Sequence, residues 1–80
     1  MTEKKTFLNE NDLCLFCDPT RAGDIYFNPK ERIFFEHLNF QGKDYLFILT
    51  EEEAKEELNA LKPFLTVEQI ERCKEIWNDF

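Results

Sequence analysis

The chain contains no serine, one histidine and two glycines among its 80 residues. A serine nucleophile triad is therefore excluded, because that chemistry needs a seryl hydroxyl beside a histidine base. A glycine-rich phosphate loop is excluded too, because Gly23 and Gly42 are far apart in the chain and each stands in a predicted turn. These absences leave few routes to catalysis, and we expect a protein without enzymatic activity.

Long apolar runs are also missing. No stretch approaches the roughly 20 apolar residues of a membrane-spanning helix, and the N-terminal residues have neither the apolar core of a signal peptide nor the arginine-rich pattern of a transit peptide. We therefore expect a cytoplasmic protein that does not bind membranes.

Positive charge is scarce as well. Ten Lys and Arg residues stand against 17 Asp and Glu, which leaves a formal net charge of −7. A chain of this charge repels the phosphate backbone of nucleic acids. We expect no direct contact with nucleic acid, and favour a basic protein surface as partner.

Aromatic residues, in contrast, are abundant: nine Phe, two Tyr and one Trp. A chain of this length forms a single domain, predicted here over 1–80, and buries only about 60% of its unfolded surface. Large aromatic side chains can compensate by forming a dense core. We therefore expect no cofactor, and we interpret the three cysteines, an odd number, as reduced thiols.

The central feature is a predicted β-hairpin from Arg32 to Thr50, in which two apolar and aromatic runs flank a polar link. Its strands are predicted over Arg32 to Phe40 and Asp44 to Thr50, because isoleucine, phenylalanine and tyrosine favour strands. Two shorter runs, Leu13 to Cys17 and Asp24 to Asn28, precede it. The pattern predicts a three- to four-stranded antiparallel meander over 13–50, after a loosely ordered arm at 1–12.

Two helices are predicted after the meander. Thr50 with Glu53, and Thr66 with Gln69, have the spacing of a capping box, in which the two side chains satisfy backbone amides at a helix start. Pro63 ends the first helix, because proline lacks the amide donor. We expect a helical hairpin over 51–80, packed on one face of the sheet, and hence an α+β fold.

The cysteines permit two interpretations. Cys14 and Cys17 have the CxxC spacing of zinc sites, and with His37 and Cys73 would complete a Cys3His set. The alternative is that the thiols are small apolar side chains in a strand and a helix. Strand alternation would place Cys14 on one face with Phe16, and Cys17 on the other. The zinc-stabilised regulatory module is our alternative function, and a small thiol enzyme using a Cys–His pair comes third.

Most of the negative charge falls on the helical segment, where nine acidic and four basic residues between 51 and 80 give a net charge of −5. Pairs such as Glu51 with Lys55, and Glu68 with Arg72, have the i,i+4 spacing of a solvated helix face. The functional alternative is an acidic field that binds a basic partner. Its members would be Glu52, Glu53, Glu56 and Glu57, joined by Glu68, Glu71, Glu75 and Asp79.

The hairpin is apolar on both faces, because Ile33 and Phe35 alternate with Phe34, Leu38 and Phe40. Two helices cover only one side of such a sheet. The other side then needs the N-terminal arm, a second copy of the chain or a target protein. We expected the side of Phe34, Leu38 and Phe40 to be the uncovered one.

These patterns together predict a small acidic protein-binding module without catalytic activity. It would modulate or inhibit a partner with a basic surface, for example a protein that handles nucleic acid. A homodimer is the other association that the apolar hairpin suggests.

Overall fold

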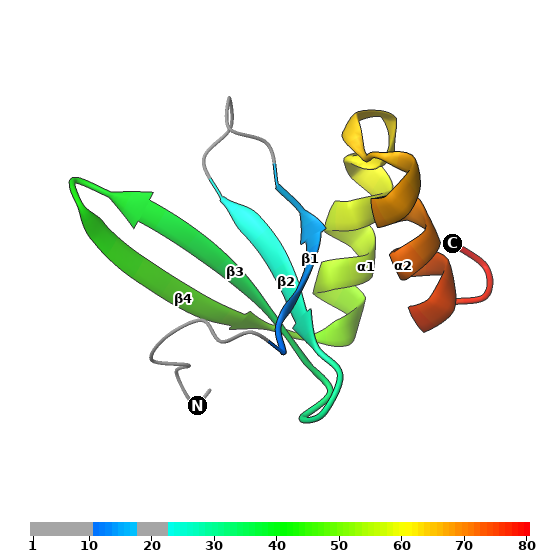
Figure 1. Ribbon diagram of the computed structural model, residues 1–80, viewed down its shortest axis with the longest axis horizontal. Coiled ribbons are helices and arrows are strands. Elements are labelled where there is room, and N and C mark those ends of the chain that lie inside the picture. The colour runs from blue at the N-terminus through cyan, green and yellow to red at the C-terminus, as the bar shows by residue number, and fades with distance from the viewer. Residues whose placement is uncertain (1–10, 18–22) are drawn as a thin grey trace.

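The computed structural model describes residues 11–17 and 23–80. In these ranges, four antiparallel strands in the order β1-β2-β3-β4 precede two α-helices and a short 3-10 turn, and the helices lie on one side of the sheet (Figure 1). The elements are β1 (Leu13–Phe16), β2 (Asp24–Asn28), β3 (Ile33–Phe40), β4 (Lys43–Leu49), α1 (Glu51–Ala60), η1 (Lys62–Phe64) and α2 (Val67–Ile76). The predicted α+β meander with a C-terminal helical pair is confirmed.

The β3–β4 hairpin is the longest pairing in the sheet, and it closes with Phe40 opposite Lys43. Gln41 and Gly42 between them have φ angles of 53° and 80°. Two successive positive φ angles define the type I′ turn, whose twist suits a two-residue hairpin connection. The connection therefore consists of two residues, one fewer than the predicted strand ends leave between them.

Strand β1 differs from the predicted alternation. Its register against β2 shifts between Cys14 and Phe16, which marks a β-bulge. As a result Leu15 and Phe16 are both buried in the core, at 0% and 3% exposure, although they are adjacent in sequence. The prediction that Phe16 shares a face with Cys14 was wrong, because an extra residue in one strand inverts the alternation.

Both helices begin at the predicted capping boxes. The Thr50 hydroxyl accepts from the amide of Glu53 at 3.1 Å, and the Glu53 carboxylate accepts from the amide of Thr50 at 2.9 Å. Thr66 and Gln69 form the same reciprocal pair at the start of α2. These local hydrogen bonds satisfy amides that a helix start leaves without partners.

The core lies between the helices and the near side of the sheet. Phe34 stacks on Trp77 at a centroid distance of 5.2 Å, and Trp77 also contacts Phe80 at 6.1 Å. The indole nitrogen of Trp77 donates to the Glu51 carboxylate at 2.9 Å. This hydrogen bond links the C-terminal end of α2 to the first residue of α1. Leu58 is completely buried in the same cluster.

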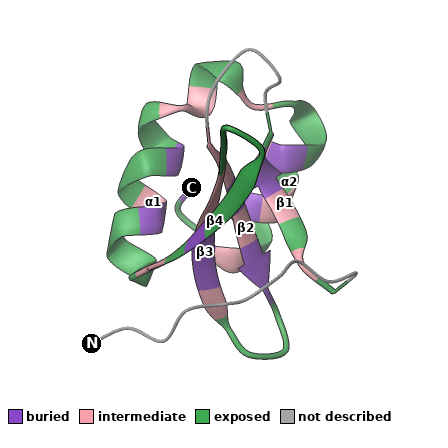
Figure 2. Ribbon diagram, turned by 90° about the vertical axis from the view of Figure 1, so that its left-hand side faces the viewer, coloured by how far each residue is buried: buried purple, intermediate pink, exposed green. Residues whose placement is uncertain are grey.

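Our expectation that Phe34 belongs to an uncovered surface was therefore wrong. Phe34 is 4% exposed and lies on the side that carries the helices. The cross-strand register places Phe34 opposite Leu49 and Leu38 opposite Tyr45, so these residues share that side of the sheet. Figure 2 shows buried residues in the part of the sheet next to the helices, whereas the end of the β3–β4 hairpin is exposed.

The other side of the sheet is more polar. Tyr26 stacks on Phe35 at 5.4 Å, and His37 lies beside the carboxylates of Asp24 and Asp44 at 3.5 and 3.0 Å. Burial raises the pKa of Tyr26 to about 12. Most of the predicted arm at 1–12 falls outside the described residues, as does most of the predicted turn between β1 and β2.

Candidate functional site

A groove lies between helix α1 and the C-terminal end of strand β4, beside Leu49, and we call it the α1–hairpin groove. In Figure 1 the hairpin projects away from the helices, so its helix-facing side is not covered along its whole length. On the same side of the sheet the hairpin continues beyond Leu49, and we call its helix-facing side chains there, Leu38, Phe40, Tyr45 and Phe47, the aromatic floor. The wall is formed by the side of α1 that carries Glu53, Glu56, Glu57 and Ala60.

The floor is apolar and accessible. Phe40, Tyr45 and Phe47 are 62%, 40% and 45% exposed. The rings of Tyr45 and Phe47, two residues apart on one strand, stack at a centroid distance of 6.5 Å. Exposed aromatic side chains that are contiguous, unlike scattered ones, are typical of surfaces that bind another molecule. The hairpin therefore presents a preformed aromatic surface.

The acidic wall owes its orientation to contacts on the opposite side of α1. Glu51 accepts from Trp77, and Lys55 donates to both carboxylate oxygens of Asp79 at 2.8 and 2.9 Å. These contacts occupy the side of α1 that faces α2. The remaining carboxylates, including Glu56 and Glu57, are exposed on the groove side.

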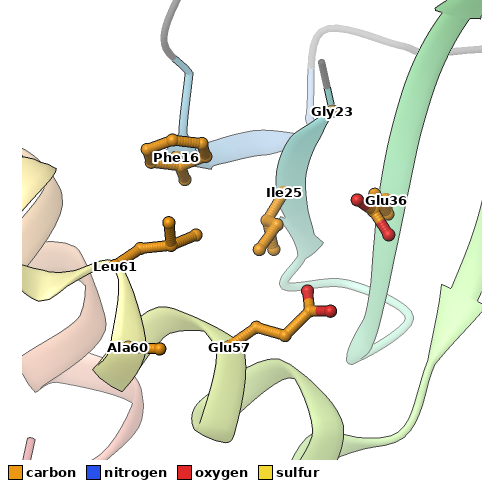
Figure 3. A pocket seen from close by; sticks show the side chains of 7 residues that line it. All are labelled: Phe16, Gly23, Ile25, Glu36, Glu57, Ala60 and Leu61. Carbon is orange, nitrogen blue, oxygen red and sulfur yellow. The ribbon is translucent and has the colours of Figure 1, made fainter. Parts of the chain in front are cut away.

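A hollow of about 340 Å³ lies between this wall and the end of β4, where it is lined by Leu49, Glu53, Glu56, Glu57 and Ala60. A second hollow of about 280 Å³ lies between the C-terminal half of α1 and the sheet (Figure 3). Its lining combines apolar side chains with two carboxylates: Phe16, Ile25, Ala60, Leu61, Gly23, Glu36 and Glu57.

Glu36 and Glu57 direct their carboxylates into the same space in Figure 3. Burial, followed by the negative charge of Glu57, raises the pKa of Glu36 above its ordinary value. No lysine or arginine of the described ranges lies within 4.0 Å of either carboxylate. A cationic group placed here would relieve the repulsion between the two acids.

Gly23 lies in the lining of this second hollow. Its φ of 96° is in the left-handed region, and a Cβ atom there would lie 2.7 Å from Oε2 of Glu36. Any larger residue would force the carboxylate to move. The glycine thus serves two purposes, since it turns the chain and allows β2 to begin directly beside Glu36.

The structure separates the residues that we singled out from the sequence. Glu53, Glu56 and Glu57 line the groove, Leu38 and Phe40 lie on the hairpin beyond it, and Phe34 is in the core. Glu52 is exposed on α1 and does not line either hollow.

Sequence reasoning missed Glu36, Tyr45 and Phe47 as site residues. The sequence feature that could have identified them is the alternation of side chains between the two faces of the hairpin strands. It puts Glu36 directly opposite Phe47 on the side of Leu38, as the only charged residue of β3 on a face that is otherwise apolar.

The four residues of the zinc alternative are not brought together. Cys73 is completely buried in the core between helices and sheet, whereas His37 lies beside Tyr26 and Asp24 on the other side. Among the described residues, no three metal-ligating side chains converge. Cys14 pairs with Tyr26 across the strands, also on the side away from Cys73.

The thiols of Cys14 and Cys73 have little nucleophilic character. Burial, with a smaller effect of the neighbouring Cys17, raises the pKa of Cys14 to about 12, and burial raises the pKa of Cys73 to about 11. Since the thiolate is the reactive form, a catalytic cysteine needs a pKa that is lowered. The described surroundings of Cys14 and Cys73 act in the opposite direction.

No helix in the ranges 11–17 and 23–80 has the length and apolar character required to cross a membrane. Comparison with protein families, with curated proteins and with solved structures finds no match for this chain. Arguments about function therefore rest on the groove and its chemistry.

Proposed function

We propose that this protein is a non-catalytic binding module that docks onto a basic and partly apolar surface of another protein through the α1–hairpin groove. It would act as a modulator or inhibitor by occupying that surface. The observation that carries the proposal is that the exposed rings of Tyr45 and Phe47 lie on the helix-facing side of the sheet, the side on which Glu53, Glu56 and Glu57 line a hollow.

The two parts of the groove would contribute differently to binding. Covering the aromatic floor removes apolar area from water, which supplies affinity at roughly 25 cal/mol per Å² before the losses of association. The acidic wall steers a basic partner towards the groove and selects against acidic ones. A net charge of −7 on 80 residues extends that attraction beyond contact distance.

The chemistry of the groove describes its partner. A complementary surface presents lysine or arginine beside aliphatic or aromatic side chains. Proteins that handle nucleic acid carry such basic clefts, and an acidic module bound there would compete with the phosphate backbone. An inhibitor of a nucleic-acid-handling protein is therefore the form of the proposal that we favour.

The test is a pair of charge reversals with equal change in net charge. Glu56→Lys/Glu57→Lys alters the groove wall, and Glu71→Lys/Glu75→Lys alters exposed residues on α2 as the matched control. The probe is a designed amphipathic peptide of lysine and leucine, titrated by calorimetry at low and physiological salt. We expect the groove variant to bind at least about tenfold more weakly, and the control to bind within about twofold of the unaltered chain.

The same three proteins, immobilised, would identify natural partners in a lysate by mass spectrometry. A true partner is captured by the unaltered chain and by the control, and is lost with the groove variant. If both double variants weaken the peptide equally, binding follows net charge alone and the groove is not the site. If neither weakens it, the acidic wall has no part in binding.

A further inference from the structure

The two edges of the sheet are protected to very different degrees. Strand β1 is four residues long and bulged, and its Cys14 carbonyl accepts from Nη1 of Arg72 at 2.8 Å. Short length, a bulge and an occupied backbone group are devices that prevent a sheet edge from pairing with another chain. This edge is closed to further pairing.

Strand β4 forms the other edge and lacks these devices. It is seven residues long, without proline or a register shift, and is apolar or aromatic from Tyr45 to Leu49. Within the described part of the chain no strand pairs with its outer side. A long apolar edge of this kind is a site for strand addition.

The turn decides which backbone groups point outwards. In a two-residue hairpin the closing residues, here Phe40 and Lys43, exchange hydrogen bonds, and bonded pairs then alternate along the strands. Every second residue of β4, beginning with Lys43, thus bonds to β3. The amides and carbonyls of Asp44, Leu46 and Ile48 face the open edge.

We propose that β4 pairs with β4 of a second copy of this chain, antiparallel and about a two-fold axis at Leu46, to form a continuous eight-stranded sheet. This register aligns all three outward residues, Asp44 with Ile48 of the second copy and Leu46 with its equivalent. It therefore permits six backbone hydrogen bonds between the copies. The inference does not depend on the proposed function.

Side-chain complementarity supports the second copy as the occupant. In this register Tyr45 lies opposite Phe47 of the second copy and Phe47 opposite its Tyr45. Two exposed stacked pairs thus become a row of four rings on one face of the joined sheet. Directly opposed aromatic side chains stabilise antiparallel strands.

Charge complementarity supports the same register. Lys43, which is exposed, comes to lie opposite Leu49 of the second copy. Leu49 shares a hollow with Glu53 and Glu56, so each Lys43 approaches the acidic wall of the other copy. In the dimer, each of the two Lys43 side chains lies near carboxylates of the other copy. This attraction offsets part of the repulsion between two chains that each have a net charge of −7.

The experiment is sedimentation velocity of the unaltered chain from micromolar to millimolar concentration, with light scattering for the mass. We expect the mass to rise from 9.7 kDa towards twice that value, about 19 kDa. Amide exchange followed by NMR should show protection at Leu46 and Ile48 that increases with concentration. A mass that stays at 9.7 kDa over the whole concentration range would overturn the proposal, even if the edge of β4 binds other partners.

Variants locate the interface. Ile48→Pro removes an outward amide while leaving bonds to β3 intact, and Phe47→Lys removes the aromatic row. Each should weaken the dimer at least about tenfold. Phe40→Lys is the matched control, because Phe40 is exposed on β3 and does not face the second copy; it should leave the dimer unchanged.

A charge swap tests the register. Lys43→Glu should weaken the dimer several-fold, and adding Glu56→Lys should restore it. Circular dichroism of every variant checks that the chain remains folded. A dimer that survives both Phe47→Lys and Ile48→Pro, or that responds equally to Phe40→Lys, would show association elsewhere and overturn the proposal. Peptide binding at the groove can succeed or fail independently of any of these results.

Discussion

Phe34 and Phe40 offer a direct test of where the helical cover of the sheet ends. They have the same side chain, lie on the same strand and face the same side, but are 4% and 62% exposed. Phe34 stacks on Trp77 at 5.2 Å, whereas Phe40 lies beyond the helices. Replacing each by alanine compares a core position with a groove position at constant chemistry.

The magnitudes follow from burial. A fully covered phenylalanine removes roughly 150–250 Å² from water, worth about 4–6 kcal/mol at 25 cal/mol per Å² as an upper value. Measured costs of Phe→Ala in cores are about 3–5 kcal/mol, and we expect Phe34→Ala in that range. Phe40 is somewhat over a third covered, so Phe40→Ala should cost about 1 kcal/mol or less.

The expected contrast is large relative to total stability, which for a domain of this size is roughly 4–12 kcal/mol. Thermal and urea unfolding followed by far-ultraviolet circular dichroism are the appropriate assays. Phe34→Ala should lower Tm by roughly 15–30 °C and Phe40→Ala by less than about 8 °C. Equal losses, or a cost below about 1 kcal/mol for Phe34→Ala, would refute the placement of Phe34 under the helices.

Two further predictions concern ionisable groups. Glu36 has a raised pKa in the folded chain. Protonation of Glu36 therefore contributes its full stabilisation at pH values below the ordinary pKa of a glutamate, and this contribution is lost as the pH rises through the raised pKa. Glu36→Gln should raise Tm by about 1–2 °C at pH 7, since solvent still partly screens the half-buried carboxylate. Near pH 3.5 the same substitution should have no effect, and an equal rise at both pH values would contradict the explanation. For the thiols, pKa values of about 12 for Cys14 and about 11 for Cys73 mean that both are protonated at pH 8. In the folded chain, a disulfide reagent should modify the exposed Cys17 rapidly and Cys14 and Cys73 slowly. In urea, all three cysteines should react quickly. Equal rates for the three cysteines in the folded chain would contradict the protection of Cys14 and Cys73.

The groove and the open edge of β4 use neighbouring surfaces in different ways. The groove is bounded by the helix-facing side chains of the hairpin and by α1, whereas the edge uses the backbone of Asp44, Leu46 and Ile48. Pairing of two copies would place two grooves on one face of a single sheet. A bivalent module of this type can bind a two-site partner more tightly than either groove alone, through effective concentration.

Local features of this protein were determined by the sequence alone. Thr50 with Glu53, and Thr66 with Gln69, mark helix starts because their hydrogen bonds join residues three apart. The hairpin was equally predictable, because alternating apolar residues and a turn at Gly42 are properties of one continuous segment. Such signals need no knowledge of distant residues.

Only the tertiary structure decided which side of the sheet the helices cover and how far. Phe34 and Phe40 are equivalent in the sequence pattern, and α1 and α2 are too short to reach both. Similarly, Lys55 has the spacing to pair with Glu51, yet it pairs with Asp79, 24 residues away, while Glu51 accepts from Trp77. The packing of α2 against α1 brings those groups together, and it leaves Glu53, Glu56 and Glu57 to line the hollow beside Leu49. The groove thus exists because two helices cover part of a longer hairpin, a matter of length and placement that no local pattern records.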